Sequence, residues 1–273
     1  MKTAVLLFGD YRHFDKASIS LEYFKYIDAD FFVSTWDKTM SYDVHLNTYT
    51  EFITEYRINR LLPRNAVFQS IEDEDRYLNL SRTEKMIRHW KVLGEALRKS
   101  SNDYDCICLL RIDLYIDSFR YDELVKESQS NKLHVGFGGW NENEEGQYSV
   151  SDVSYSGKTE TILKYIDMLP IALIASHTDF GCILKYSNIE LENQKSINGL
   201  LVRPLTASFL GEDPKSNEKF LKGNFENVSM LNLIYNNWLH GYSYGNSKTL
   251  SLKNFIKYFK EHINNFKIED YEQ

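Results

Sequence analysis

The sequence lacks the features that mark several large classes of protein. It has three cysteines in 273 residues, a small and odd number that argues against a disulfide scaffold and suits a reducing compartment. No apolar stretch approaches the roughly 20 residues that a membrane-spanning helix needs. The formal net charge of -7 argues against a nucleic-acid-binding surface, which needs clustered lysine and arginine.

Targeting segments and the common nucleotide-binding loops are also missing. The chain begins Met1-Lys2-Thr3 and runs directly into an apolar strand, without a long hydrophobic region or a small-residue cleavage site. We therefore expect a soluble, cytoplasmic protein. No Gly-x-Gly-x-x-Gly turn follows the first strand, and no Gly-x-x-x-x-Gly-Lys-Ser/Thr loop occurs. Their absence argues against a dinucleotide-binding enzyme and a P-loop NTPase.

The apolar residues that are present alternate between strand-like and helix-like segments. Short apolar runs predict strands at 2–8, 30–36, 66–68, 105–110, 133–135 and 150–155. Helical spacing predicts helices at 16–27, 43–62, 159–169, 177–186, 228–239 and 252–266, and one that Ser81 begins with Glu84 completing a capping box. This order predicts an α/β fold with a mostly parallel sheet flanked by helices and a helical C-terminal portion.

The central strand ends in an arginine and a carboxylate. The apolar run Cys106-Ile107-Cys108-Leu109-Leu110 leads into Arg111 and Asp113. Such a run is typical of a strand buried on both faces, and open α/β sheets bind ligands outside the carboxyl ends of such strands. Arginine suits a phosphate, and a carboxylate suits a hard divalent cation. The alternative is a salt bridge at a strand end without a function.

Two other strand ends are expected beside this one. Gly9-Asp10-Tyr11-Arg12 follows the first strand, and Ser34-Thr35-Trp36 closes the second. Neighbouring parallel strands bring such ends to one edge, where backbone, hydroxyl, cationic and carboxylate groups together suit a nucleoside diphosphate with a metal.

These motifs carry a resemblance to a known family. Together with Ser151-Asp152-Val153-Ser154-Tyr155-Ser156-Gly157, they make residues 1–185 similar to small glycosyltransferases of the GT-A fold, of the phage, viral and bacterial surface-polysaccharide type. The resemblance implies a GT-A-like, Rossmann-related sheet, a nucleotide-sugar donor that is often a UDP-sugar, and Mn²⁺ or Mg²⁺. A viral member would work in the host cytoplasm.

The resemblance also implies roles for individual residues. Gly9 and Arg12 would contact the nucleotide, Ser34 or Thr35 the base or ribose, and Arg82 the same nucleotide from its helix N-terminus. Asp113 would hold the metal, as part of a metal-binding motif whose usual sequence in GT-A enzymes is Asp-x-Asp. Here Arg111 replaces the first aspartate. Either Asp113 binds a cation with help from Asp117 or a distant histidine, or Arg111 neutralises the phosphate charge itself.

Several further residues have two possible roles each. Asp152 is the candidate catalytic carboxylate, with capping of the next segment as its alternative. The literal Asp103-Tyr104-Asp105 precedes the central strand, so we expect a turn on the edge opposite the ligand. Gly136 to Gly139 forms either a sharp turn or a close approach to the sugar. His177 and His240 are structural residues or distant contacts.

We therefore expect one GT-A-like domain over residues 1–273, with a nucleotide-binding half at about 1–120 and an acceptor-side half with C-terminal helices at about 121–273. The chain shows no internal repeat or low-complexity linker. The expected function is transfer of a sugar from a nucleotide-diphosphate donor to a glycan or another hydroxyl acceptor. The alternative is a catalytically weak module of the same fold that binds a nucleotide or a nucleotide sugar.

Overall fold

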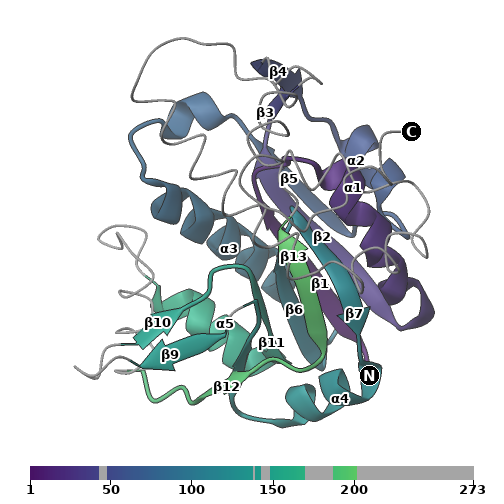
Figure 1. Cartoon of the computed structure of the whole chain (residues 1–273), viewed down its shortest axis with the longest axis vertical. Coiled ribbons are helices and arrows are strands. Elements are labelled where there is room, and N and C mark those ends of the chain that lie inside the picture. Colours follow the sequence, from purple (N-terminus) through teal and green to yellow (C-terminus); the bar gives the residue numbers. More distant parts are fainter. Residues whose placement is uncertain (43–47, 138, 143–147, 170–186, 202–273) are drawn as a thin grey trace, which may run out of the picture.

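A computed structural model describes residues 1–42, 48–137, 139–142, 148–169 and 187–201 (Figure 1). The strands are β1 (Thr3–Gly9), β2 (Ala29–Trp36), β3 (Lys38–Tyr42), β4 (Thr48–Phe52), β5 (Phe68–Glu72), β6 (Cys106–Arg111), β7 (Leu114–Phe119), β8 (Leu133–Val135), β9 (Trp140–Glu142), β10 (Tyr148–Val150), β11 (Ser154–Lys158), β12 (Leu191–Asn193) and β13 (Ile197–Leu201). The helices are α1 (Phe14–Ala17), the 3-10 helix η1 (Ser18–Tyr26), α2 (Glu55–Leu61), the 3-10 helix η2 (Glu74–Tyr77), α3 (Arg82–Lys99), α4 (Tyr121–Gln129) and α5 (Thr159–Met168).

A seven-stranded sheet forms the centre of the molecule, in the order β12-β8-β11-β6-β1-β2-β5. β1 pairs parallel with β2 and with β6, β2 with β5, and β8 with β12. Only β11 runs antiparallel, between β6 and β8. The predicted α/β fold with a mostly parallel sheet is therefore confirmed.

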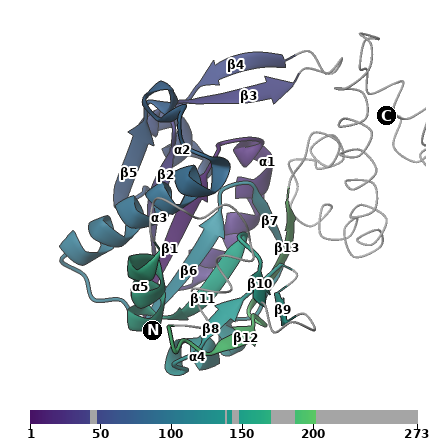
Figure 2. The same ribbon diagram turned by 90° about the vertical axis from the view of Figure 1, so that its left-hand side faces the viewer.

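Each face of the sheet has its own hydrophobic core, because successive side chains of a strand point to opposite faces. Val5 and Leu7 of β1 pack with α1, η1, α2, α4 and β7, whereas Leu6 and Phe8 pack with α3 and α5 around Trp90. Figure 2 shows α3 and α5 on one side of the sheet and β7 and β13 on the other. This burial on both faces explains why residues 4–8 of β1 and 106–110 of β6 are all apolar.

The sequence prediction is wrong where tertiary pairing overrides a helical pattern. The segment predicted as one helix over 43–62 instead contains β4, which pairs antiparallel with β3, and the short helix α2. Thr48-Tyr49-Thr50-Glu51-Phe52 is rich in β-branched and aromatic residues, which favour a strand. The hairpin of β3 and β4 extends beyond the carboxyl ends of β1 and β2, at the top of Figure 1.

Smaller corrections concern element boundaries. The helix predicted over 16–27 is a short α-helix followed by a 3-10 helix, and the strand predicted at 66–68 begins at Phe68. The strand predicted over 150–155 is divided between β10 and β11. β7 and α4 were not predicted. The helices predicted at 177–186, 228–239 and 252–266 lie outside the described residues. Within the described part of the chain, no helix is long and apolar enough to cross a membrane.

Candidate functional site

The carboxyl ends of β6, β1 and β2 lie side by side, as the sequence predicts. Phe8 of β1 is in register with Arg111 on one side and with Ser34 on the other. A cavity of about 760 Å³ opens at this edge. Its lining includes the five cationic side chains Arg12, Lys38, Arg82, Lys85 and Arg111 and the three carboxylates Asp10, Glu74 and Asp152.

Gly9 ends β1 and exposes its backbone to the cavity. Its φ of +109° lies in a region that residues with a side chain rarely adopt, and the position of a Cβ would be open space. The Gly9 carbonyl accepts a hydrogen bond from Thr35 Oγ1 at 2.7 Å, which joins the ends of β1 and β2. A ligand can therefore approach the main chain closely at this point.

Two arginines approach the cavity from different elements. Arg12 follows β1, and its Nε donates to Asp10 Oδ2 at 2.8 Å. Asp10 Oδ1 also accepts from Thr39 Oγ1 at 2.6 Å, which ties this turn to the β3–β4 hairpin. Arg82 is exposed at the first residue of α3. The predicted nucleotide contacts Gly9, Arg12 and Arg82 thus line one cavity.

Arg111 and Asp113 form a two-pronged ion pair. Arg111 Nε donates to Asp113 Oδ1 at 3.0 Å, and Arg111 Nη2 donates to Asp113 Oδ2 at 2.8 Å. The Asp113 side chain is 2% exposed, and that of Arg111 19%. Arg111 Nη1 lies 3.9 Å from Asp152 Oδ1. Burial disfavours the charged guanidinium, but the carboxylates of Asp113, Asp152 and Asp10 outweigh it and raise the pKa of Arg111.

This pair does not fit the predicted metal site. A divalent cation needs several oxygen ligands, and both oxygens of the buried Asp113 already accept from a guanidinium. Among the described residues, no three His, Cys, Asp or Glu side chains are grouped so that they could hold a metal ion. Asp117 lies in β7 and does not line the cavity. The role of Asp113 as a metal ligand stays a prediction.

Ser34 and Thr35 are not brought to the cavity. Both are fully buried, and neither lines it. Thr35 bonds to Gly9 as described above, and Ser34 Oγ lies 2.8 Å from Nδ1 of His89 in α3. Their contact with a base or ribose stays a prediction, while the neighbouring Trp36 does line the cavity.

His89 of α3 forms part of the cavity wall, where its ring packs against Trp36. Its ring centroid lies 4.3 Å from that of Trp36. Burial, and secondarily the neighbouring charge of Arg88, lowers the pKa of His89 to about 3. The imidazole is therefore neutral at physiological pH.

Sequence reasoning missed the contribution of the β3–β4 hairpin and of η2. Lys38, Thr39 and Thr50 reach the cavity from the hairpin, and Glu74 reaches it from η2. Glu74 Oε1 accepts from Lys85 Nζ at 2.7 Å. The alternation of residues 48–52 was the signal from which a strand could have been predicted there. The position of the hairpin beside this cavity follows only from the folded structure.

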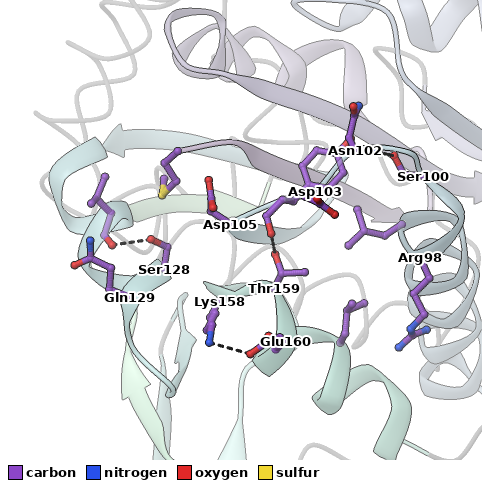
Figure 3. Close-up of a pocket in the computed structure, with 15 residues that line it drawn as sticks. Arg98, Ser100, Asn102, Asp103, Asp105, Ser128, Gln129, Lys158, Thr159 and Glu160 are labelled. Atoms are coloured by element: carbon purple, nitrogen blue, oxygen red, sulfur yellow. Dashed lines mark hydrogen bonds and ion pairs between the residues drawn. The ribbon is translucent and has the colours of Figure 1, made fainter.

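The opposite edge of the sheet holds a second cavity, of about 670 Å³ (Figure 3). Asp103 and Asp105 line it and belong to the turn before β6, as expected. Asp105 Oδ2 accepts from the Lys2 backbone N–H at 2.7 Å, and Thr159 Oγ1 donates to the Tyr104 carbonyl at 2.7 Å. The literal Asp-x-Asp therefore serves as a link between β1, β6 and α5.

The glycine-rich segment after β8 is a tight turn. Gly139 has a φ of +63°, and a Cβ at Gly136 would lie 2.0 Å from Gln194 Oε1. Packing and backbone conformation account for both glycines. Gly138, His177 and His240 lie outside the described residues.

Comparison with known proteins finds similarity to solved structures but not to known sequences. No protein-family model and no curated protein sequence matches the chain. The crystal structure of galactosyltransferase LgtC in complex with donor and acceptor sugar analogs is similar with a TM-score of 0.42 and 15% sequence identity, and the match covers 70% of this chain and 73% of that one. The function of the present chain is therefore inferred from the geometry of its own site.

Proposed function

We propose that this protein is a GT-A-like glycosyltransferase that moves a sugar from a nucleotide-diphosphate donor, a UDP-sugar, to a hydroxyl group of a glycan. The observation that carries the proposal is the cavity at the carboxyl ends of β6, β1 and β2, because it combines an open glycine backbone with five cationic side chains. Such an edge is where open α/β sheets bind nucleotides. The motifs at Gly9–Arg12, Ser34–Trp36 and Arg111–Leu114 support the same family.

The cationic side chains suit a diphosphate better than a neutral ligand. Arg12 and Arg111 approach the cavity from the β1 and β6 ends, and Arg82 approaches it from the start of α3. The chain as a whole carries a net charge of -7. A concentration of positive charge in one cavity of an acidic protein points to a local anionic ligand.

Asp152 is the carboxylate suited to act on the acceptor. It lines the cavity, its side chain is 25% exposed, and it faces Arg111. In the transfer, the bond between the anomeric carbon and the diphosphate oxygen breaks, and its electron pair leaves with the diphosphate. The acceptor oxygen bonds to that carbon, and its proton passes to Asp152. Cations beside the departing diphosphate stabilise the charge that develops on it.

The test is release of nucleoside diphosphate from a panel of nucleotide sugars, with and without oligosaccharide acceptors. We expect release from one donor, faster with its acceptor, and at least 100-fold slower in Asp152→Asn, since general-base catalysis contributes about 10²- to 10⁴-fold. Arg98→Gln is the control, because Arg98 pairs with Asp167 at the opposite edge of the sheet.

The second candidate function is a nucleotide-binding module with little turnover. The pairing of Asp113 with Arg111 favours it, since that aspartate stands where the enzymes of this fold hold their metal. Tight binding of a nucleoside diphosphate without release from any donor, with or without acceptors, would support the module. Failure to bind any nucleoside diphosphate would contradict both functions.

A further inference from the structure

The Arg111–Asp113 pair has a geometry that bears on how the site handles phosphate charge. Nε and Nη2 of Arg111 both donate to Asp113, so the guanidinium is held by the two parallel hydrogen bonds that arginine and carboxylate form most strongly. The third nitrogen, Nη1, makes no hydrogen bond to another described residue, and its nearest carboxylate oxygen is that of Asp152 at 3.9 Å. The guanidinium thus has a fixed position at the cavity wall.

Metal binding by Asp113 would compete with this arrangement. The carboxylate would have to share its oxygens between the guanidinium and a divalent cation, and the cation would then lie beside the positive charge of Arg111. The Asp113 side chain is only 2% exposed, which leaves no room for the water ligands that Mg²⁺ usually keeps. Separating a buried charge pair is also costly, because each partner is left uncompensated.

We propose that Arg111, held in place by Asp113, supplies the positive charge that a divalent cation would otherwise bring to the donor diphosphate, so that this site works without a metal. The inference rests on the proposed function. Asp113 is then a positioning residue, and Arg111 is the residue that contacts phosphate through Nη1. Burial strengthens this contact, because a charge interaction is less screened at a site largely removed from water.

The experiment measures the affinity of the whole protein for UDP, GDP and ADP by calorimetry, once with EDTA and once with Mn²⁺. For the tightest-binding diphosphate we expect affinities within about twofold of each other in the two buffers. Arg111→Gln is expected to weaken binding about 10- to 100-fold in both buffers, as loss of a hydrogen bond to a charged group does. Arg98→Gln, which removes a cation from the opposite edge, should bind like the unchanged protein.

Asp113→Asn separates the two possible roles of the aspartate. As a positioning residue, its loss should weaken binding equally in EDTA and in Mn²⁺, and by less than Arg111→Gln does. The double variant Arg111→Gln with Asp113→Asn removes both buried charges at once and nearly keeps their volume. It guards against misfolding of Arg111→Gln, which leaves Asp113 unpaired, and it should bind as weakly as that variant.

Binding that is ten or more times tighter in Mn²⁺ than in EDTA, and that loses this difference in Asp113→Asn, would overturn the inference and leave the proposed function standing. Binding that Arg111→Gln and the double variant leave unchanged would overturn it as well. If the unchanged protein binds none of the three diphosphates in either buffer, the proposed function itself fails and the inference falls with it.

Discussion

At the scale of single residues, Glu127 shows how this fold satisfies a buried charge. The residue is 3% exposed on α4. Oε1 accepts from the backbone N–H groups of Lys195 and Ser196, at 2.7 and 3.0 Å, and Oε2 accepts from the hydroxyl groups of Ser156 and Ser196, each at 2.5 Å. One carboxylate therefore fixes the segment between β12 and β13 against β11.

Replacing Glu127 by glutamine should destabilise the protein by about 2 kcal/mol, because the amide nitrogen cannot accept hydrogen bonds and leaves buried donors without an acceptor. The free energy of unfolding, measured in urea, checks this. Glu123→Gln on the same helix is the control, since Lys126, the one described residue that pairs with Glu123, has a side chain that is 67% exposed. We expect that variant to change stability by less than about 0.5 kcal/mol. Equal effects of the two substitutions would contradict this account.

His89 predicts a dependence of stability on pH. The pKa of this buried imidazole is about 3, against 6.5 for the exposed group. Between these two values the unfolded chain binds a proton that the folded protein does not, so stability falls as pH falls through 6.5. The charged neighbours on α3 and on the elements beside it are Arg88, paired with Glu72, and Lys85, paired with Glu74.

The expected loss from His89 is at most about 1.4 kcal/mol for each pH unit below 6.5. Urea unfolding between pH 7 and 5 measures it, in a range where most carboxylates stay charged. His89→Gln should show a shallower slope than the unchanged protein, and His134, whose pKa burial also lowers, is present in both proteins. Identical slopes would show that folding does not lower the pKa of His89.

At the scale of elements, α3 is the helix whose start was predicted best and on which the site most depends. Ser81 Oγ accepts from the Glu84 N–H at 3.2 Å, and the Ser81 N–H donates to Glu84 Oε2 at 2.7 Å. Bonds to the carboxylate, from the backbone and then the side chain of Ser81, lower the pKa of Glu84. This capping box fixes the first turn of α3, which carries Arg82.

Ser81→Ala should therefore cost about 1 kcal/mol of stability. It should also weaken nucleotide binding a few-fold, because the first turn of α3, which carries Arg82, is then less well ordered. Unfolding in urea and calorimetry with UDP measure the two effects. Ser128→Ala, on α4, is a suitable control, since the Ser128 hydroxyl donates to the Val125 carbonyl of the same helix. A loss of stability without any loss of affinity would contradict the role of this capping box in positioning Arg82 for the nucleotide.

Elements with strong local signals could be predicted from the sequence, and elements fixed by distant pairing could not. β1 and β6 are buried on both faces, so their apolar runs identified them and placed Gly9 and Arg111 at the same edge. The β3–β4 hairpin depends on pairing between its two strands, which lie on either side of the segment 43–47. Residues 48–52 also fall within a stretch whose spacing favours a helix. Ser34 shows the same limit for side chains, because only the packing of α3 decides that its hydroxyl faces His89.

At the scale of the whole molecule, the two edges of the sheet differ in how many cationic side chains line their cavities. At the amino edge, Arg98 pairs with Asp167, and Lys158 pairs with Glu160. At the carboxyl edge, five cations line one cavity with three carboxylates. Four of these cations already pair with a carboxylate: Arg12 with Asp10, Lys38 with Asp75, Lys85 with Glu74 and Arg111 with Asp113. A bound diphosphate would add a further anionic partner for them and for Arg82, and binding to the folded state alone stabilises that state.

A nucleoside diphosphate should therefore raise the unfolding temperature. At a concentration 100 times its dissociation constant, UDP is expected to add about 2.7 kcal/mol of stability, which corresponds to a shift of several degrees for a chain of this size. Thermal unfolding followed by circular dichroism measures the shift. Uridine at the same concentration lacks the diphosphate and should produce almost none. A shift from uridine as large as that from UDP would mean that the base and ribose, and not the cations of this edge, provide the binding energy.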